Sequence, residues 1–217
     1  MLANSTLYDK VIENIQESLI NNFDTTSIDN GSYHISTLEN ITYRITTTKN
    51  RERQKNDSIT TIDLGECANN LKGEYNLSFN ENLYILMIDM FVNNIEKVEY
   101  KVYYNFSSKN LTKLNLTSCK DTKIAISIPR DIPYNEIDKY NKSSGYYNDI
   151  CYTLTSESGT DKPLKDRQDD YNKNNLSLCE EGCDFSSYNK ESKKVECSWD
   201  TKMSIPKLSE IKVDKKN

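Results

Sequence analysis

Six cysteines constrain this chain more than any other feature, because four of them fall in its last third, between residues 151 and 197. Few aliphatic residues stand near these four, so the stretch has little apolar surface to bury and needs cross-links to hold a fixed shape. We therefore expect residues 149–200 to form a small disulfide-held cap behind a larger domain. An even number of cysteines around a thin core is typical of an oxidising compartment.

The four cysteines of the cap allow three pairings. Cys179 and Cys183 are only four residues apart, so a bond between them would constrain almost nothing. Each is therefore expected to reach a different segment. We predict Cys151–Cys183 and Cys179–Cys197, and the alternative is Cys151–Cys179 with Cys183–Cys197.

Potential N-glycosylation sites indicate the same kind of compartment. The sequence Asn-X-Ser/Thr occurs ten times, whereas 26 Asn and 39 Ser or Thr in 217 residues would give about five by chance. The ten asparagines are Asn4, Asn30, Asn40, Asn56, Asn76, Asn105, Asn110, Asn115, Asn141 and Asn175. Cysteines and sequons together predict an extracellular or cell-surface protein. A cytosolic protein with incidental sequons is the alternative.

No targeting segment is visible in the sequence. The first ten residues are neither basic nor apolar, and the longest apolar stretch, 83–92, is interrupted by Asp89. Because the cysteines and sequons imply a secretory route, we interpret the chain as an internal piece of a longer membrane or secreted protein. Any membrane contact would then come from a missing flanking segment.

Hydrophobic periodicity predicts a mainly β fold behind one helix. Apolar residues at every fourth position from Leu7 to Phe23 predict an amphipathic helix. Alternating patterns then predict half-buried strands at 41–46 and 98–104, and the continuous apolar run at 83–92 predicts a central covered strand. Two residues, 93 and 94, would join the last two strands as a hairpin.

Shorter elements complete the predicted strand block. Strands are expected at 58–64, at 114–116 and at 124–128, and a short helix at 66–75. Cys67 and Cys119 lie beside strand ends at the edges of this block, so we expect them to bond. Pro129 and Pro133 end the run, because proline cannot donate to a sheet.

The predicted architecture is an antiparallel β-sandwich with an N-terminal amphipathic helix and a small disulfide-held C-terminal cap. Residues 1–130 would form the helix and sandwich, and residues 131–148 a polar linker with Gly145 as a hinge. Residues 149–200 would be the cap, with a helix starting near Pro163. Residues 201–217 would be a stalk.

Charge and residue types argue against several functions. The net charge of −5 is interspersed, so the chain has no basic face for nucleic acid. The only histidine, His34, is expected on a solvated loop, and it does not complete a zinc site or a Cys-His nucleophile. The acidic runs at 166–170 and 180–184 lack the alternating oxygen ligands of a calcium loop and are expected to be solvated. We expect no metal, no cofactor and no enzymatic activity.

Element order and the last cysteines carry a resemblance. The sequences Gly-Cys-Asp-Phe at 182–185 and Val-Glu-Cys-Ser-Trp at 195–199 resemble the juxtamembrane autoproteolysis-inducing (GAIN) domain, with its proteolysis-site motif, of adhesion receptors and polycystins. The chain also resembles ectodomain segments of large cysteine-bearing surface proteins from AT-rich protist genomes. Thr-Thr-Ile-Asp-Leu-Gly-Glu-Cys at 60–67 and Asp-Ile-Cys-Tyr at 149–152 carry that second resemblance.

The end of the motif departs from the GAIN family. That family has a second cysteine followed by His-Leu-Ser/Thr, whereas Trp199 stands here in place of the cysteine and Asp200, Thr201 and Lys202 follow. Cleavage needs a histidine to help a hydroxyl attack its own peptide bond. The resemblance therefore implies a degenerate, non-cleaving copy, and we predict that the chain stays intact after Trp199.

These features favour a non-enzymatic extracellular module with a structural, adhesion or assembly role in a larger surface protein. Its partners would be other segments of that protein or a separate protein partner, and it would carry N-glycans. The alternative is a secreted carbohydrate-binding or hydrolytic domain, for which paired carboxylates at the strand ends of a cleft would be diagnostic.

Overall fold

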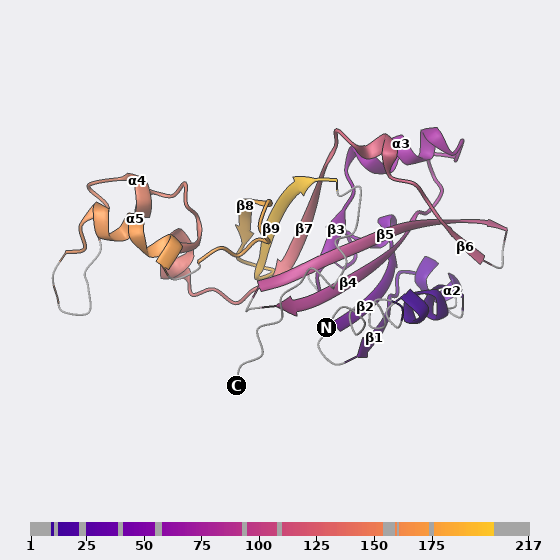
Figure 1. Ribbon diagram of the computed structural model, residues 1–217, viewed down its shortest axis with the longest axis horizontal. Helices are drawn as coiled ribbons and strands as arrows, with labels where there is room; N and C mark the ends of the chain where they lie inside the picture. The colour runs from indigo at the N-terminus through magenta and orange to yellow at the C-terminus, as the bar shows by residue number, and fades with distance from the viewer. Residues whose placement is uncertain are drawn as a thin grey trace.

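The predicted sandwich is confirmed by a computed structural model of the chain, in which two antiparallel sheets pack face to face (Figure 1). The structure describes residues 10, 13–21, 25–38, 41–54, 58–92, 95–107, 110–153, 159, 161–173 and 176–201.

The first sheet has five strands in the order β1-β2-β4-β5-β6. Their bounds are β1 His34–Leu38, β2 Ile41–Thr47, β4 Tyr84–Val92, β5 Ile95–Ser107 and β6 Asn110–Lys113. The apolar run forms the central strand β4, as predicted, because both faces of this sheet are covered. Val92 lies opposite Ile95, which fixes the register of the predicted hairpin.

The second sheet has four strands in the order β3-β7-β9-β8. Their bounds are β3 Thr61–Asp63, β7 Lys123–Pro129, β8 Asp184–Asn189 and β9 Lys194–Asp200. The isoleucines of β7 alternate with more exposed residues, as the sequence predicted, and point at the first sheet. Strand β9 lies between β7 and β8 although it comes last along the chain.

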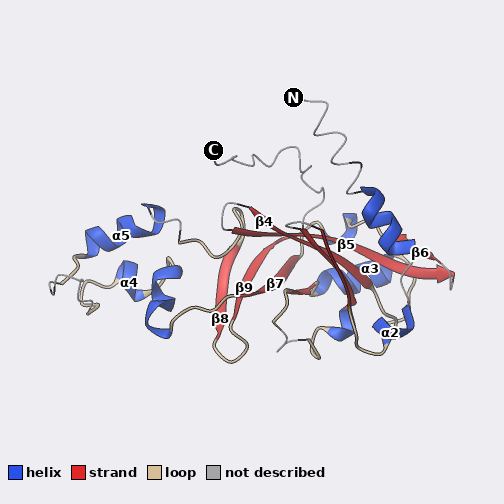
Figure 2. Cartoon of the chain, turned by 90° about the horizontal axis from the view of Figure 1, so that it is seen from below, coloured by secondary structure: helices blue, strands red, loops and turns tan. Residues whose placement is uncertain are grey.

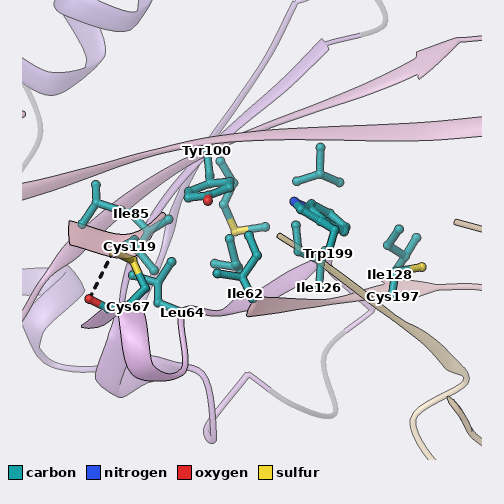
Figure 3. Close-up of a cluster of buried hydrophobic side chains, with 14 of the residues drawn as sticks. Ile62, Leu64, Cys67, Ile85, Tyr100, Cys119, Ile126, Ile128, Cys197 and Trp199 are labelled. Atoms are coloured by element: carbon teal, nitrogen blue, oxygen red, sulfur yellow. Dashed lines mark hydrogen bonds between the residues drawn. A yellow bond between two sulfur atoms is a disulfide. The ribbon is translucent and has the colours of Figure 1, made fainter. Parts of the chain in front are cut away.

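The main core lies between the two sheets. Ile85 and Tyr100 of the first sheet face Ile62, Ile126 and Trp199 of the second (Figure 3). Helix α3 (Glu66–Glu74) closes one end of this core and turns its buried side chains inward, as its four-residue spacing predicted. The short helix η2 (Thr117–Cys119) lies beside it.

Two helical segments cover the other face of the first sheet. Residues 13–21 are helical, and α2 spans Thr25–Asp29. Ile20 and Ile28 from these helices pack on Tyr43, Ile45 and Leu86 and form a second core. The predicted amphipathic N-terminal helix is therefore present, and the molecule has three layers.

Strand β2 differs from its prediction. Its alternation indicated one solvated face, but both faces are covered, and Arg44 and Thr46 are buried. Arg44 lies opposite Met87, a residue of the main core, and so points between the sheets. After β2 the chain forms η1 (Thr48–Asn50), where the buried Asn50 donates through its side-chain amide to the carbonyl of Ile28 at 2.6 Å.

Between β7 and β8 the chain leaves the sandwich and folds into a side lobe, seen at the left of Figures 1 and 2. The lobe contains η3 (Tyr134–Tyr140), α4 (Gly145–Asn148) and α5 (Leu164–Lys173). The linker predicted at 131–148 is thus an ordered part of the lobe, with Gly145 as the first residue of α4. The predicted helix after Pro163 is confirmed as α5.

The range 149–200 is also divided differently from its prediction. The described residues between 149 and 173, which are 149–153, 159 and 161–173, belong to the lobe, whereas 184–200 supply two strands of the second sheet. The reason is the alternation of Val195, Cys197 and Trp199, which places three apolar side chains in the main core. Of the predicted stalk, only Thr201 is among the described residues.

Candidate functional site

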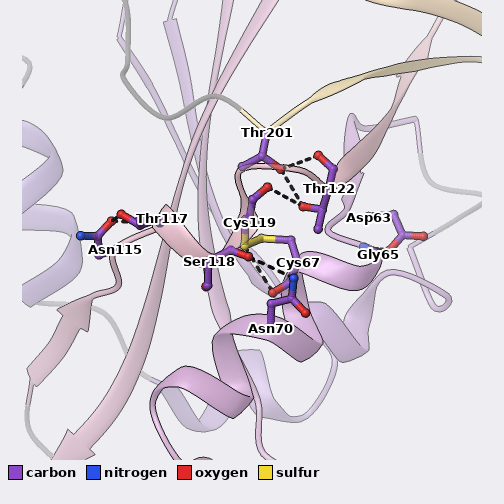
Figure 4. The surroundings of a disulfide bond; sticks show 10 residues. All are labelled: Asp63, Gly65, Cys67, Asn70, Asn115, Thr117, Ser118, Cys119, Thr122 and Thr201. Atoms are coloured by element: carbon purple, nitrogen blue, oxygen red, sulfur yellow. Dashed lines mark hydrogen bonds between the residues drawn. A yellow bond between two sulfur atoms is a disulfide. The ribbon is translucent and has the colours of Figure 1, made fainter.

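The first predicted disulfide is confirmed. Cys67 on α3 bonds Cys119 at the end of η2, with a Cα–Cα distance of 4.8 Å, and both residues are fully buried (Figure 4). The amide of Asn70 donates to the carbonyl of Ser118 at 3.0 Å and joins the same two elements a second time. This bond closes one end of the sandwich.

The second predicted disulfide is also confirmed. Cys179, in the segment that precedes β8, bonds Cys197 on β9, with a Cα–Cα distance of 5.7 Å. It fastens the chain to the central part of the second sheet where the chain returns from the lobe. Two buried disulfides favour an oxidising, non-cytosolic compartment.

The third predicted disulfide, Cys151–Cys183, is wrong. Among the described residues, which include all six cysteines, these two are thiols. Cys151 is exposed in the lobe, and Cys183 lies in the turn that leads into β8 of the sandwich. An even number of cysteines suggested the bond, but the two residues belong to different parts of the fold.

Thiol mapping checks this assignment. Unfolding the oxidised protein in denaturant with N-ethylmaleimide should add two labels, one at Cys151 and one at Cys183. Mass spectrometry of the peptides should find Cys67, Cys119, Cys179 and Cys197 only in linked pairs. A label on any of those four, or an unlabelled Cys151, would contradict the structure.

The predicted glycosylation sites fall into three groups. Asn30, Asn76 and Asn115 are exposed, and Asn105 and Asn141 are half-buried. The side chain of Asn110 and the residues Asn4, Asn40, Asn56 and Asn175 lie outside the described part. The exposed members leave room for a glycan, and attachment itself stays a prediction.

The segment compared with a cleavage site is held by ordinary packing and hydrogen bonds. Trp199 is buried in the main core. The backbone N–H and the hydroxyl of Thr201 both donate to the carbonyl of Thr122, at 3.1 and 3.0 Å (Figure 4). His34 is exposed on β1, a strand rather than the predicted loop. These contacts favour the predicted intact chain.

No metal or membrane element is seen in the described ranges. No three His, Cys, Asp or Glu side chains there are placed to hold a metal ion, and none of the helices described is long and apolar enough to cross a bilayer. One part of the acidic run 166–170 is not simply solvated, because Asp170 accepts hydrogen bonds from Lys162 and from the hydroxyl of Tyr146.

The lobe is built around one buried arginine. Arg167 on α5 is only 1% exposed, and it donates to the carbonyls of Tyr146 at 2.7 Å and Asp149 at 3.0 Å. Its guanidinium also lies 5.8 Å from the ring centre of Tyr146 and 5.5 Å from that of Tyr152. Arginine suits this place because its planar, multiple donors bind two carbonyls while its face stacks on rings.

Tyrosine rings replace the usual aliphatic core of the lobe. Tyr146 and Tyr147 are buried, and Tyr147 meets Tyr171 of α5 edge to face at 5.6 Å. Burial raises the pKa of Tyr147 to about 12, and burial with the hydrogen bond to Asp170 also raises the pKa of Tyr146. Burial opposes ionisation of Asp170, but its bonds to Lys162 and Tyr146 hold its pKa below the usual value. The rings therefore stay neutral and packed at physiological pH.

The lobe is attached to the sandwich through η3, and it exposes one large apolar side chain. Ile137 and Tyr140 of η3 pack against the main core. Ile150, which follows α4, is 79% exposed next to the exposed Cys151. The lobe is thus an ordered projection with a fixed base.

Sequence reasoning missed this lobe. A Tyr-Tyr pair at 146–147, followed by a helix with one arginine and almost no aliphatic residues, was the signal that could have found it. The sequence of the lobe appears polar because the lobe is filled by tyrosine rings and a guanidinium in place of aliphatic side chains.

Comparison of the chain with protein-family models, with curated proteins and with solved structures gave no match.

Proposed function

We propose that this chain is a non-enzymatic extracellular module of a larger surface protein, and that the lobe is its contact element for assembly or adhesion. The observation that carries the proposal is an ordered lobe that projects sideways from a cross-linked sandwich (Figure 1). A projection with its own core can meet a partner without rearrangement of the sandwich, which lowers the entropic cost of binding.

The attachment of the lobe supports this role. Ile137 and Tyr140 anchor η3 on the sandwich core, and the disulfide Cys179–Cys197 fixes the chain where it returns. The segments that enter and leave the lobe are thereby both held. A contact made at the lobe would be transmitted to the sandwich through these two attachments.

The cross-links and exposed sequons support the extracellular location. The partner would be another segment of the same surface protein or a second surface protein, and N-glycans would cover part of the sandwich. A non-cleaving relationship to GAIN domains belongs to the proposal, and the buried Trp199 with the hydrogen-bonded Thr201 supports it.

Cross-linking on intact cells that display the full-length surface protein tests the proposal. An amine-reactive reagent should link Lys165 and Lys173, both exposed on α5, to peptides from outside residues 1–217. Lys120, exposed near α3 at the other end of the sandwich, serves as the internal comparison. Mass spectrometry of the cross-linked peptides gives the number of outside links from Lys165 and Lys173 relative to the number from Lys120.

A matched pair of variants makes the test specific. Ile150→Glu should reduce the outside links from the lobe about tenfold, the scale of one important interface residue. Phe79→Glu changes an apolar residue that is 74% exposed on the sandwich and should leave them unchanged. Links from the lobe only to this chain, or turnover of glycoside and ester substrates by the purified protein, would argue for the alternative function.

A further inference from the structure

Three aromatic rings form an exposed cluster beside the end of α3. Phe106, near the end of β5, is 51% exposed, and its ring meets that of Tyr104 edge to face at 4.7 Å. The ring centre of Tyr75, the residue after α3, lies 6.2 Å from that of Phe106. Tyr75 and Tyr104 pack against the main core, so this ring cluster continues the core to the surface. It differs in this from an apolar side chain that stands alone among polar ones.

A glycosylation sequon is held against the ring cluster. The backbone N–H of Asn115 donates to the hydroxyl of Tyr75 at 2.9 Å. Leu114, the residue before it, is buried, and the disulfide at Cys119 fixes the chain shortly after it. Asn115 and the exposed ring of Phe106 are therefore only two contacts apart, and the backbone on both sides of Asn115 is held in place.

The side chain of Asn115 turns its amide nitrogen outward. Its Oδ1 accepts from the backbone N–H of Thr117 at 3.0 Å and from the hydroxyl of the same residue at 2.6 Å (Figure 4). A backbone N–H can only donate, so the atom that faces it is the oxygen, and Nδ2 lies on the other side. The residue as a whole is exposed. A glycan attached to Nδ2 would keep both bonds to Thr117, because the substituted amide retains its oxygen.

Two other sequons with described side chains lie beside the ring cluster, and both are less suited. Asn105 precedes Phe106 directly, but it is half-buried and its side-chain oxygen is enclosed. Asn76 follows Tyr75 directly and is exposed, but no described residue bonds to its side-chain amide to fix the direction of that amide. Asn115 is thus the sequon whose amide nitrogen is both turned outward and fixed beside the rings.

We propose that Asn115 carries an N-glycan whose first sugars cover the ring cluster. In the transfer, Nδ2 bonds to C1 of a sugar that is delivered as a polyprenyl diphosphate-linked oligosaccharide. The bond between C1 and the diphosphate oxygen breaks, the diphosphate leaves with the electron pair, and the transferase takes one amide proton. The C–H groups on one face of a sugar pack on the face of an aromatic ring while its hydroxyls stay in water. This inference rests on the extracellular location in the proposed function, but not on the lobe.

Occupancy is measured on the full-length surface protein taken from cells that display it. Enzymatic release of N-glycans in heavy-oxygen water converts each occupied asparagine into a labelled aspartate, which peptide mass spectrometry locates. Asn115 should carry the label. Label at other sequons but not at Asn115 would overturn this inference and leave the proposed function standing. Absence of label from every sequon would overturn this inference and also contradict the extracellular location.

Thermal unfolding of the chain secreted from cultured cells tests the contact between glycan and rings. Asn115→Asp cannot be glycosylated, but its carboxylate still accepts both bonds from Thr117, so the variant removes the glycan and keeps the turn. It should lower the Tm by about 2 to 4 °C. Asn30→Asp makes the same change at an exposed sequon in the turn between α2 and β1, and it should lower the Tm by less than about 1 °C.

A change of the ring itself completes the test. In a Phe106→Ser background the glycan has lost its most exposed ring, so Asn115→Asp should then lower the Tm by less than about 1 °C. Equal shifts for the Asn115 and Asn30 variants would overturn the proposed contact. The same shift for Asn115→Asp with and without the ring of Phe106 would overturn it as well.

Discussion

Replacing Arg44 by methionine is expected to lower the free energy of unfolding by about 3 to 5 kcal/mol. Its guanidinium lies between the two sheets, 3.2 Å from the carboxylate of Asp89 and 2.6 Å from the carbonyl of Thr60. The side chains of Arg44 and Asp89 are almost fully buried. Removing the cation leaves a carboxylate that is only 11% exposed without this counter-charge, so hydration can replace the cation only in part. Urea unfolding followed by Trp199 fluorescence measures the loss.

Two further variants show whether the ion pair itself is responsible. Arg44→Met with Asp89→Leu removes both charges and should recover most of the loss, since a buried pair and an apolar pair of similar volume are often close in stability. Lys123→Met breaks the exposed pair with Asp184 and should change stability by less than about 1 kcal/mol. A double variant as unstable as Arg44→Met alone would mean that packing, not charge, dominates at this position.

Removing the disulfide Cys67–Cys119 with a pair of alanines is expected to cost about 4 kcal/mol. The bond closes a loop of 52 residues, so its loss allows many more conformations to the unfolded chain. The same change at Cys179 and Cys197, where the separation is 18 residues, should cost about 3 kcal/mol. Urea unfolding measures the two costs from the shifts in the midpoints, provided that the dependence of the unfolding free energy on urea concentration is unchanged.

If loop length determines the cost, removing Cys67–Cys119 should destabilise the protein more than removing Cys179–Cys197. A larger loss at Cys179 and Cys197 would show that fixing the return of the chain to β9 matters more than loop length. Treating the wild-type protein with reductant should reproduce the sum of both losses, provided that the reduced cysteines pack as the alanines do.

The sandwich was predictable because its signals are local. The continuous apolar run indicates the central strand β4, and the isoleucines at 124, 126 and 128 indicate the buried face of β7. Cys67 and Cys119 each lie beside a strand end, so the sequence alone is enough to pair them. Each of these features depends on a few neighbouring residues, and the tertiary structure agrees with the local pattern.

The wrong predictions concern side chains whose partners are distant in the sequence. Arg44 alternates with apolar residues and so predicted a solvated face, but Asp89 and Thr60 satisfy it inside the sandwich. The same holds for Arg167, whose partners are carbonyls of α4 and the residue after it. A buried charge cannot be recognised in a sequence until its partner has been placed.

The lobe and the polar outer face of the second sheet were unequally visible from sequence. The lobe had weak signals in its tyrosines, whereas the polar outer face had none, because its residues, which lie between 51 and 196, come from four strands, the loop after η1 and the turn between β8 and β9. Only the register of β3, β7, β9 and β8 brings Thr61, Ser127 and Glu196 into one row.

The position of β9 has a consequence for biosynthesis. A chain is made from its N-terminus at about 5 to 20 residues per second, so β7 is complete long before the strand that pairs with it. Until residues 194–200 emerge, β7 is an edge strand on the side of β9, and Val195, Cys197 and Trp199 are missing from the core that contains its isoleucines. Such an apolar edge pairs readily with other chains. Synthesis of this protein therefore includes an interval of exposure that ends only when β9 inserts between β7 and β8.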